Sequence, residues 1–210
     1  FQINEMCNPW PSRIKGQIEL SVPALGQKSF ALDPGGLHRW WPAAPAGRVT
    51  VTMQRPDISW EGAAYLDCNA GVVPLEQTFR NWHWQRSAAE AGGGHIHYDA
   101  TLLNGDRRFL GLGYGPDMSC SELSNPGEDT AMVATPLWRA QRRCRTVTGQ
   151  ARVKQTLEES PFYARSVVEL DTGLGPRKVM HESLHLDRFT RPWMQMMLPV
   201  RMPRRPLHRP

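Results

Sequence analysis

The sequence predicts an all-β protein whose antiparallel strands form a barrel or a sandwich. Apolar and polar residues alternate over residues 14–22 and 49–53, as they do in strands with one buried face. Pro23 and Pro56 follow these runs and suit strand ends. The chain also has 18 glycines and 18 prolines for turns, and no segment keeps a helical period long enough to predict a helix. Many short strands separated by turns favour a closed or layered antiparallel architecture.

The same alternation predicts further strands along the rest of the chain. They cover residues 63–67, 95–103, 109–114, 132–138, 151–157, 166–170 and 179–186. With 210 residues the chain is long enough for one large β domain or two small ones. We expect an N-terminal β region over residues 1–88, a C-terminal β region over 89–190, and a basic tail rich in Pro, Arg and Met over 191–210.

The charge and the cysteine content limit the classes to which this protein can belong. The formal net charge is +5, but residues 191–210 hold five arginines and no acidic residue, so the rest of the chain is neutral. The four cysteines lie far apart without a CxxC pair, which predicts reduced thiols in a cytoplasmic protein. No apolar run is long enough for a membrane span, and no signal peptide is visible. Because the chain begins with Phe1 and strand-like sequence follows at once, we expect it to be cut from something longer.

Two short segments carry the first candidate site. His38 and Trp40 lie two residues apart, as do Tyr65 and Asp67. In extended chain, residues two apart share a face, so an imidazole, an indole, a phenol and a carboxylate could line one pocket. A carboxylic acid kept protonated by apolar surroundings can protonate an alkene, and aromatic faces stabilise the resulting cation. The simpler interpretation makes Trp40 and Tyr65 core aromatics and Asp67 a turn residue.

An ordered set of motifs around these residues resembles the carotenoid 1,2-hydratase family, also called hydroxyneurosporene synthases. The segments are GLHRWWP at 36–42, GAAYLDCNAG at 62–71, PLE at 74–76 and WHWQR at 82–86. Similarity continues through 182–184, 188–189 and 192–193, so it covers nearly the whole chain. Family members extend further toward the N-terminus, and the resemblance therefore implies that the N-terminal β region is truncated.

The resemblance implies a lipocalin-like β fold in two parts and a reaction without a metal or organic cofactor. The reaction would be hydration of the terminal double bond of an acyclic carotene such as neurosporene or lycopene, with water as the second substrate. The family's functional residues fall on His38, Trp40, Tyr65 and Asp67. We expect Asp67 to give a proton to C2, Tyr65 and Trp40 to stabilise the cation at C1, and His38 to orient Asp67 or the water.

The histidine-rich segment 181–185 competes with this interpretation, because HESLH matches the HExxH pattern of zinc proteases. That pattern binds zinc only on a helix, where both histidines face one metal. Residues 179–186 alternate as a strand does, and no downstream residue suits the third ligand, so we prefer two histidines on a strand face. A protein that binds an isoprenoid without reacting is the other alternative to a hydratase.

Two further features have both a functional and a simpler interpretation. His95, His97 and Asp99 could form a metal face, but the simpler interpretation is the polar face of a strand after a glycine turn. Two tryptophans in the segment 82–84 are expected in the barrel core, where they and Trp41 could border a carotene cavity.

The tail mixes Trp, Met, Leu and Arg, which suits an anionic lipid surface better than nucleic acid, since the rest of the chain is charge-neutral. We therefore expect no nucleic-acid partner. We expect a cytoplasmic protein peripherally associated with the inner or photosynthetic membrane. A tail without function is the simpler alternative.

Overall fold

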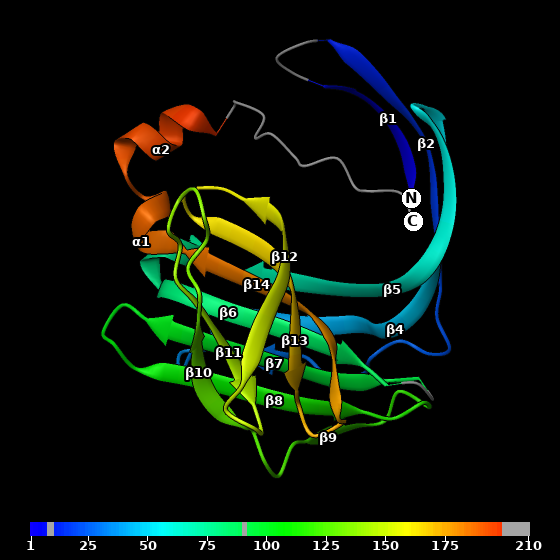
Figure 1. The fold of residues 1–210 in the computed structure, drawn as a ribbon. Coiled ribbons are helices and arrows are strands. Elements are labelled where there is room, and N and C mark those ends of the chain that lie inside the picture. Colours follow the sequence, from blue (N-terminus) through cyan, green and yellow to red (C-terminus); the bar gives the residue numbers. More distant parts are fainter. Residues whose placement is uncertain (8–10, 90–91, 199–210) are drawn as a thin grey trace.

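A computed structural model describes residues 1–7, 11–89 and 92–198, and in them it confirms the all-β class. Fourteen strands of this described part fall into three antiparallel sheets (Figure 1). The first sheet has the order β1-β2-β4-β3, and β5 pairs with β4. Its strands are β1 (Gln2–Cys7), β2 (Ser12–Ser21), β3 (Phe30–Ala31), β4 (His38–Arg55) and β5 (Asp57–Gly71).

The second sheet is the largest and has the order β12-β13-β14-β6-β7-β8-β9. Its strands are β6 (Phe79–Ala88), β7 (Gly94–Leu102), β8 (Arg107–Tyr114), β9 (Cys120–Glu122), β12 (Ala151–Glu159), β13 (Tyr163–Asp171) and β14 (Pro176–His185). The third sheet is the hairpin of β10 (Glu128–Met132) and β11 (Arg142–Thr146). Strand β6 belongs by sequence to the expected N-terminal region, residues 1–88. In the sheet it lies between β14 and β7, which belong to the expected C-terminal region.

Strand alternation gives the seven-stranded sheet two different faces. On β6, Trp82 and Trp84 point to one face and His83 and Gln85 to the other, as the period of two requires. The tryptophan side packs against β3, β4 and β5, and we call it the aromatic face. The other side packs against β11, and we call it the histidine face.

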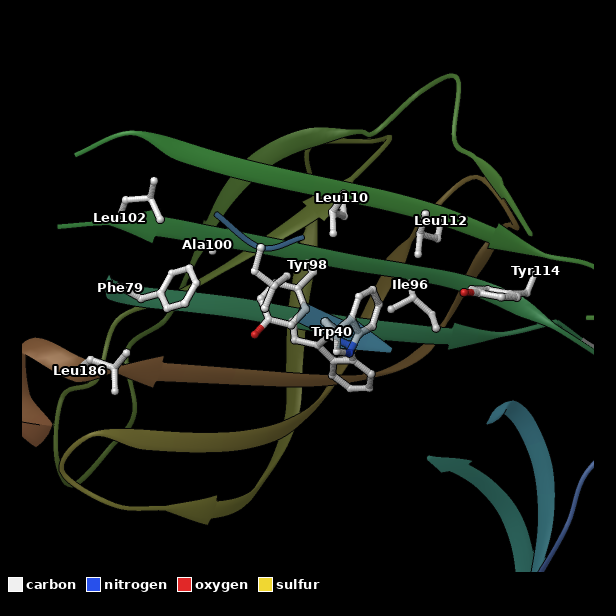
Figure 2. Packing of buried hydrophobic residues seen from close by; sticks show 12 residues of the cluster. Trp40, Phe79, Ile96, Tyr98, Ala100, Leu102, Leu110, Leu112, Tyr114 and Leu186 are labelled. Atoms are coloured by element: carbon white, nitrogen blue, oxygen red, sulfur yellow. The ribbon is translucent and has the colours of Figure 1, made fainter. Parts of the chain in front are cut away.

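The main hydrophobic core lies on the aromatic face. Figure 2 shows Trp40 of β4 beside Tyr98 of β7, in a row of buried side chains that runs from Phe79 to Tyr114. Trp40, Phe79 and Ala100 are completely buried. Burial of large aromatic side chains is a major contribution to the stability of a hydrophobic core. It therefore fixes the beginning of β4 on the seven-stranded sheet.

One predicted strand is wrong. Residues 132–138 do not form a strand, because β10 ends at Met132 and the chain then turns. Thr135 accepts a hydrogen bond from the backbone N–H of Ala140, and Glu159 accepts bonds from the N–H groups of Leu137 and Trp138. These side chains satisfy the backbone in place of a partner strand.

The helical elements of the described residues are short. They are η1 (Leu75–Gln77) before β6, and α1 (Leu186–Phe189) and α2 (Pro192–Met197) after β14. In the described residues, none of the helices has the length and apolar character that crossing a bilayer requires. Residues 199–210, which hold four of the five tail arginines, lie outside the described residues.

Candidate active site

The candidate site centres on Asp67, which joins Trp40 and Tyr65. The Trp40 indole Nε1 donates a hydrogen bond of 2.7 Å to Oδ2 of Asp67, and the Tyr65 hydroxyl donates one of 3.0 Å to the same oxygen. Asp67 is half-buried. Both of these donors are neutral, so they orient the carboxyl group without supplying a positive charge.

The long hairpin of β4 and β5 brings these three residues together. Its pairing places Trp40 opposite Asn69, two residues beyond Asp67, and shifts register between Trp41 and Gly47. Pro42 and Pro45 lie in this irregular stretch. Because proline cannot donate a backbone hydrogen bond, it is tolerated where a ladder is interrupted, and such bulges bend a strand. The hairpin curves away toward β1 and β2 beyond this point (Figure 1).

The opposite wall of the site is a row of side chains across the seven-stranded sheet. Arg165, Glu182, Trp84 and Tyr98 occupy successive paired positions on β13, β14, β6 and β7. The Tyr65 ring lies 5.0 Å from that of Trp84, and the Trp40 ring lies 5.2 Å from that of Tyr98. The hairpin therefore meets the sheet through two aromatic contacts on either side of Asp67.

A pocket of about 280 Å³ opens between the hairpin and the sheet. It is lined by Tyr65, Leu66, Asp67, Asn69, Trp82, Trp84, Tyr98, Arg165 and Glu182. Aromatic rings make up much of its wall, and two carboxylates reach it from different sheets. Such a pocket can hold an apolar group, protonate it and stabilise a cation by ring faces.

Comparison with known proteins assigns the family of the chain. The family model described as "Carotenoid hydratase CrtC" matches residues 1–209. The chain belongs to the carotenoid hydratase family. This confirms the family that the sequence motifs indicated.

Curated relatives agree with this assignment. The chain is 41% identical over 205 residues to an "Acyclic carotenoid 1,2-hydratase" of Thiocapsa roseopersicina and 37% identical over 207 residues to one of Rubrivivax gelatinosus. Each match covers 97% of this chain and 50% of the relative, so the chain spans about half the length of these relatives. A relative from Cereibacter sphaeroides is 36% identical and is covered to 73%. A search of solved structures gave no significant match.

The electrostatics of Tyr65 fit a donor rather than a base in this member of the carotenoid hydratase family. Burial raises the pKa of the Tyr65 hydroxyl far above its ordinary value, and the charge of Asp67 and the hydrogen bond to it raise the pKa further. Arg86 lies with its guanidinium 5.4 Å from the centre of the Tyr65 ring. The hydroxyl therefore stays protonated and continues to donate to Asp67.

His38 lies on the same strand as Trp40 but makes different contacts. Its Nε2 is 3.0 Å from the hydroxyl of Thr78, and its ring packs 5.0 Å from that of Phe79. A side chain at Gly71 would overlap the imidazole, so only glycine fits opposite it. Among the described residues, the hydrogen bonds of His38 do not reach Asp67. The part that the sequence assigned to this histidine stays a prediction.

The three tryptophans predicted to border the substrate occupy two environments. Trp82 and Trp84 line the pocket. Trp41 points to the other side of β4 from Trp40, and its Nε1 donates to the carbonyl of Gly26 at 2.6 Å. Trp41 is therefore not among the residues that line this pocket.

The HExxH segment of this family member lies on strand β14, as its alternation predicted. His181 and His185 point to the histidine face, where their Nε2 atoms donate to the carbonyls of Arg143 and Gln141. Glu182 points to the aromatic face and the pocket. The described residues hold no group of three or more His, Cys, Asp or Glu side chains arranged to bind a metal ion, and this holds for His95, His97 and Asp99 as well.

Sequence reasoning missed Tyr98, Arg165 and Glu182, which complete the pocket. Each lies on a strand remote in sequence from Asp67, and only the pairing of the seven-stranded sheet brings them near. One signal was present in the sequence: Glu182 stands between Met180 and Leu184 on the apolar side of an alternating strand. A carboxylate in an apolar row is a marker of a functional site.

Proposed function

We propose that this protein adds water across the terminal C1=C2 double bond of an acyclic carotenoid, such as lycopene or neurosporene, by acid catalysis. The observation that carries the proposal is Asp67, held by two neutral aromatic donors at the edge of an aromatic pocket. The names of the relatives support the substrate class. On this proposal the protein is a hydro-lyase of carotenoid biosynthesis.

The proposed reaction begins at Asp67. Trp40 and Tyr65 both donate to Oδ2, so the proton of the acid form resides on Oδ1. This proton moves to C2 of the alkene, the π electrons form the new C–H bond, and C1 becomes a tertiary cation. Water then forms a bond to C1 and loses a proton, and the product is a tertiary alcohol.

The aromatic side chains stabilise the cation. Tyr65, Trp82 and Trp84 line the pocket with their rings. A well-placed ring face contributes about 0.5 to 2 kcal/mol to binding a cation, with the larger value where water is excluded. The pocket volume of about 280 Å³ suits the end group of a long polyene rather than its whole length. The rest of the chain would therefore extend out of the pocket.

Replacement of Asp67 by Asn tests this function. Asn keeps the size and the acceptor oxygen but has no acidic proton, so we expect hydration of lycopene to fall by about 100-fold or more, within the range that positioned acids contribute. The assay follows the gain of one water by mass spectrometry. Asp57→Asn, at the exposed start of the same strand, is the matched control and should hydrate lycopene as the unmodified protein does.

Three outcomes separate the alternatives. If Asp67→Asn binds lycopene as before and no longer hydrates it, Asp67 is the acid. If the unmodified protein binds lycopene and never hydrates it, the protein is a carrier and the proposal is wrong. Unchanged turnover in Asp67→Asn would remove Asp67 from the role of acid.

We further propose that the end of the described chain meets an anionic membrane at the cytoplasmic side. Trp193, Met196 and Leu198 are exposed, and Arg191 precedes them. Exposed Trp, Met and Leu beside a cation suit the headgroup region of a bilayer, where carotenes are dissolved. Co-sedimentation with phosphatidylglycerol vesicles should exceed that with phosphatidylcholine vesicles, and equal binding would contradict the proposal.

A further inference from the structure

A second carboxylate, Glu182, faces the pocket from the wall opposite Asp67. Asp67 comes from β5 and Glu182 from β14, so the two belong to different sheets that meet at the pocket. Oε1 of Glu182 lies 2.9 Å from Nε of Arg165 on β13. The Glu182 side chain is 25% exposed, and that of Arg165 is 44% exposed. Both members of this ion pair line the pocket.

The two carboxylates have different partners. Asp67 accepts hydrogen bonds from a neutral indole and a neutral phenol. Glu182 is instead paired with the guanidinium of Arg165, which is always charged. Two carboxyl groups in one site with different surroundings are suited to different proton-transfer roles. Asp67 suits the donor, and Glu182 suits the acceptor.

The hydroxyl of Tyr98 is influenced by both carboxylates. Burial raises its pKa well above the ordinary value, and the charges of Asp67 and then Glu182 raise the pKa further. Within the described part of the chain this buried hydroxyl has no hydrogen-bond partner. A buried polar group without a protein partner is a position where a water molecule gains a hydrogen bond. Tyr98 also lines the pocket between the strands that carry Asp67 and Glu182, while its hydroxyl is itself closed to solvent.

We propose that Glu182, held by Arg165, binds the water that attacks the carbocation and accepts the proton which that water loses. This proposal rests on the hydratase function proposed above and assigns its second half. A water oxygen lone pair forms the C1–O bond. One O–H bond breaks, its electrons stay on the oxygen, and the proton moves to Glu182.

The proton balance of this step closes without another reactant. After one turnover Asp67 has lost a proton and Glu182 has gained one. Transfer of this proton through solvent in the open pocket returns Glu182 to the carboxylate and Asp67 to the acid. A protonated tertiary alcohol is a much stronger acid than a carboxylic acid, so a carboxylate paired with arginine is basic enough for the step.

The experiment follows the fate of the carbocation in D₂O. Lycopene is incubated with the 210-residue protein and its variants, and mass spectrometry measures both the alcohol and the deuterium in recovered lycopene. In Glu182→Gln we expect the alcohol to fall by about 100-fold, a typical loss for a positioned base. Deuterium should still enter the recovered carotene, because a cation formed at the usual rate and not captured by water loses a proton and becomes an alkene again.

Matched variants separate this role from a structural one. Glu169→Gln breaks a cross-strand pair with Lys154 on the same sheet, away from the pocket, and should hydrate lycopene normally. Glu182→Asp retains a carboxylate and should recover part of the hydration. Asp67→Asn should lose both the alcohol and the deuterium exchange. Thermal melting confirms that each variant is folded.

Three results would overturn the proposal. Glu182→Gln could hydrate lycopene as fast as the unmodified protein. It could lose exchange and hydration in equal measure while folded, which would place Glu182 outside the water step. If the unmodified protein shows neither exchange nor hydration, the hydratase function itself fails, and this result is distinguishable because it does not depend on the Glu182 variants.

Discussion

The two faces of the seven-stranded sheet place similar residue types in opposite environments. On the aromatic face, Glu182 and Asp67 border a pocket of about 280 Å³. On the histidine face, His83, His97 and Asp99 border a space of about 10 Å³, room for roughly one water molecule, under the β10–β11 hairpin. One face leaves space for a ligand, and the other is filled by its own polar network.

The histidine face is closed because its side chains bond to the backbone of the hairpin. Gln85 exchanges two hydrogen bonds with the main chain of Arg145, through its amide nitrogen at 2.7 Å and its amide oxygen at 2.8 Å. His181 and His185 donate to two further carbonyls of the same segment. These bonds satisfy main-chain groups that a sheet partner would otherwise satisfy. Polar residues here serve packing, and carboxylates on the other face remain available for chemistry.

Breaking the buried ion pair of the histidine face should have the largest effect on stability. Asp99 accepts hydrogen bonds from Arg145 at 2.7 and 2.9 Å and from Arg107 at 2.8 Å, and its side chain is 8% exposed. Because Asp99→Ala leaves buried positive charge without its partner, the free energy of unfolding should fall by about 3 to 5 kcal/mol. Urea denaturation measures this loss.

The control for that variant is an exposed pair. Glu61→Ala removes the partner of Arg48, where the two side chains are 53% and 68% exposed, and should cost less than about 1 kcal/mol. Hydration per folded molecule should be unchanged in Asp99→Ala. A specific loss of hydration in the folded fraction would show that the two faces are not independent.

The next largest effect should come from a fall in pH, which should destabilise the histidine face. Burial is the main cause that lowers the pKa of His97 to about 3 and that of His181 to about 4. Unfolded histidine has a pKa of about 6.5, so between about pH 6.5 and pH 4 the unfolded chain binds more protons than the folded one. Stability is therefore fully present above pH 6.5 and is lost as the pH falls, by up to about 1.4 kcal/mol per pH unit for each histidine.

Chemical denaturation at pH 7, 6 and 5 measures this dependence. His97→Asn removes one of the titrating groups and should flatten the curve. A stability that does not change over this range would mean that these histidines are not held in their neutral form.

Removal of the Tyr65 hydroxyl should have the smallest effect. It tests what the aromatic face contributes beyond its rings. Tyr65→Phe removes one of two donors to Asp67 but keeps the ring against Trp84, so we expect about a tenfold loss of hydration, equivalent to about 1.4 kcal/mol. Tyr65→Ala should lose far more, since the ring is lost as well. Single-turnover rates compare the two, with melting as the check on folding. If both variants are equally inactive, the hydroxyl is itself a proton donor.

Local sequence patterns predicted the features that a single strand determines by itself. The alternation that placed Trp40 beside His38, and Tyr65 beside Asp67, is a property of each strand. The sequence also indicated that residues 181–185 form a strand, which separates Glu182 from its neighbouring histidines. That Trp40 and Tyr65 both donate to one oxygen of Asp67 depends on the register of the β4–β5 hairpin and its bulges, which no strand pattern specifies.

The features of the fold and the site that the sequence did not predict depend mostly on contacts between distant segments. Tyr98 and Glu182 enter the site because β6 lies between β7 and β14, and strand order is not written in any local pattern. The segment 132–138 has the apolar residues of a strand, but the side chains of Thr135 and Glu159 bind its backbone instead. His38 shares a strand with Trp40, yet the loop before β6 brings Thr78 to its ring.

Strand β6 contributes alternate side chains to both interiors of the protein, and this makes its length critical. Trp82 and Trp84 belong to the pocket, while His83 and Gln85 belong to the layer under the hairpin. Loss or gain of one residue within 82–85 would exchange the two sets and bury polar groups among aromatic rings on one side and indoles among ion pairs on the other. Substitutions in this strand would damage one layer at a time, whereas a single-codon deletion would damage both at once. The loops that join the strands have no such constraint, so variation in chain length should be confined to them.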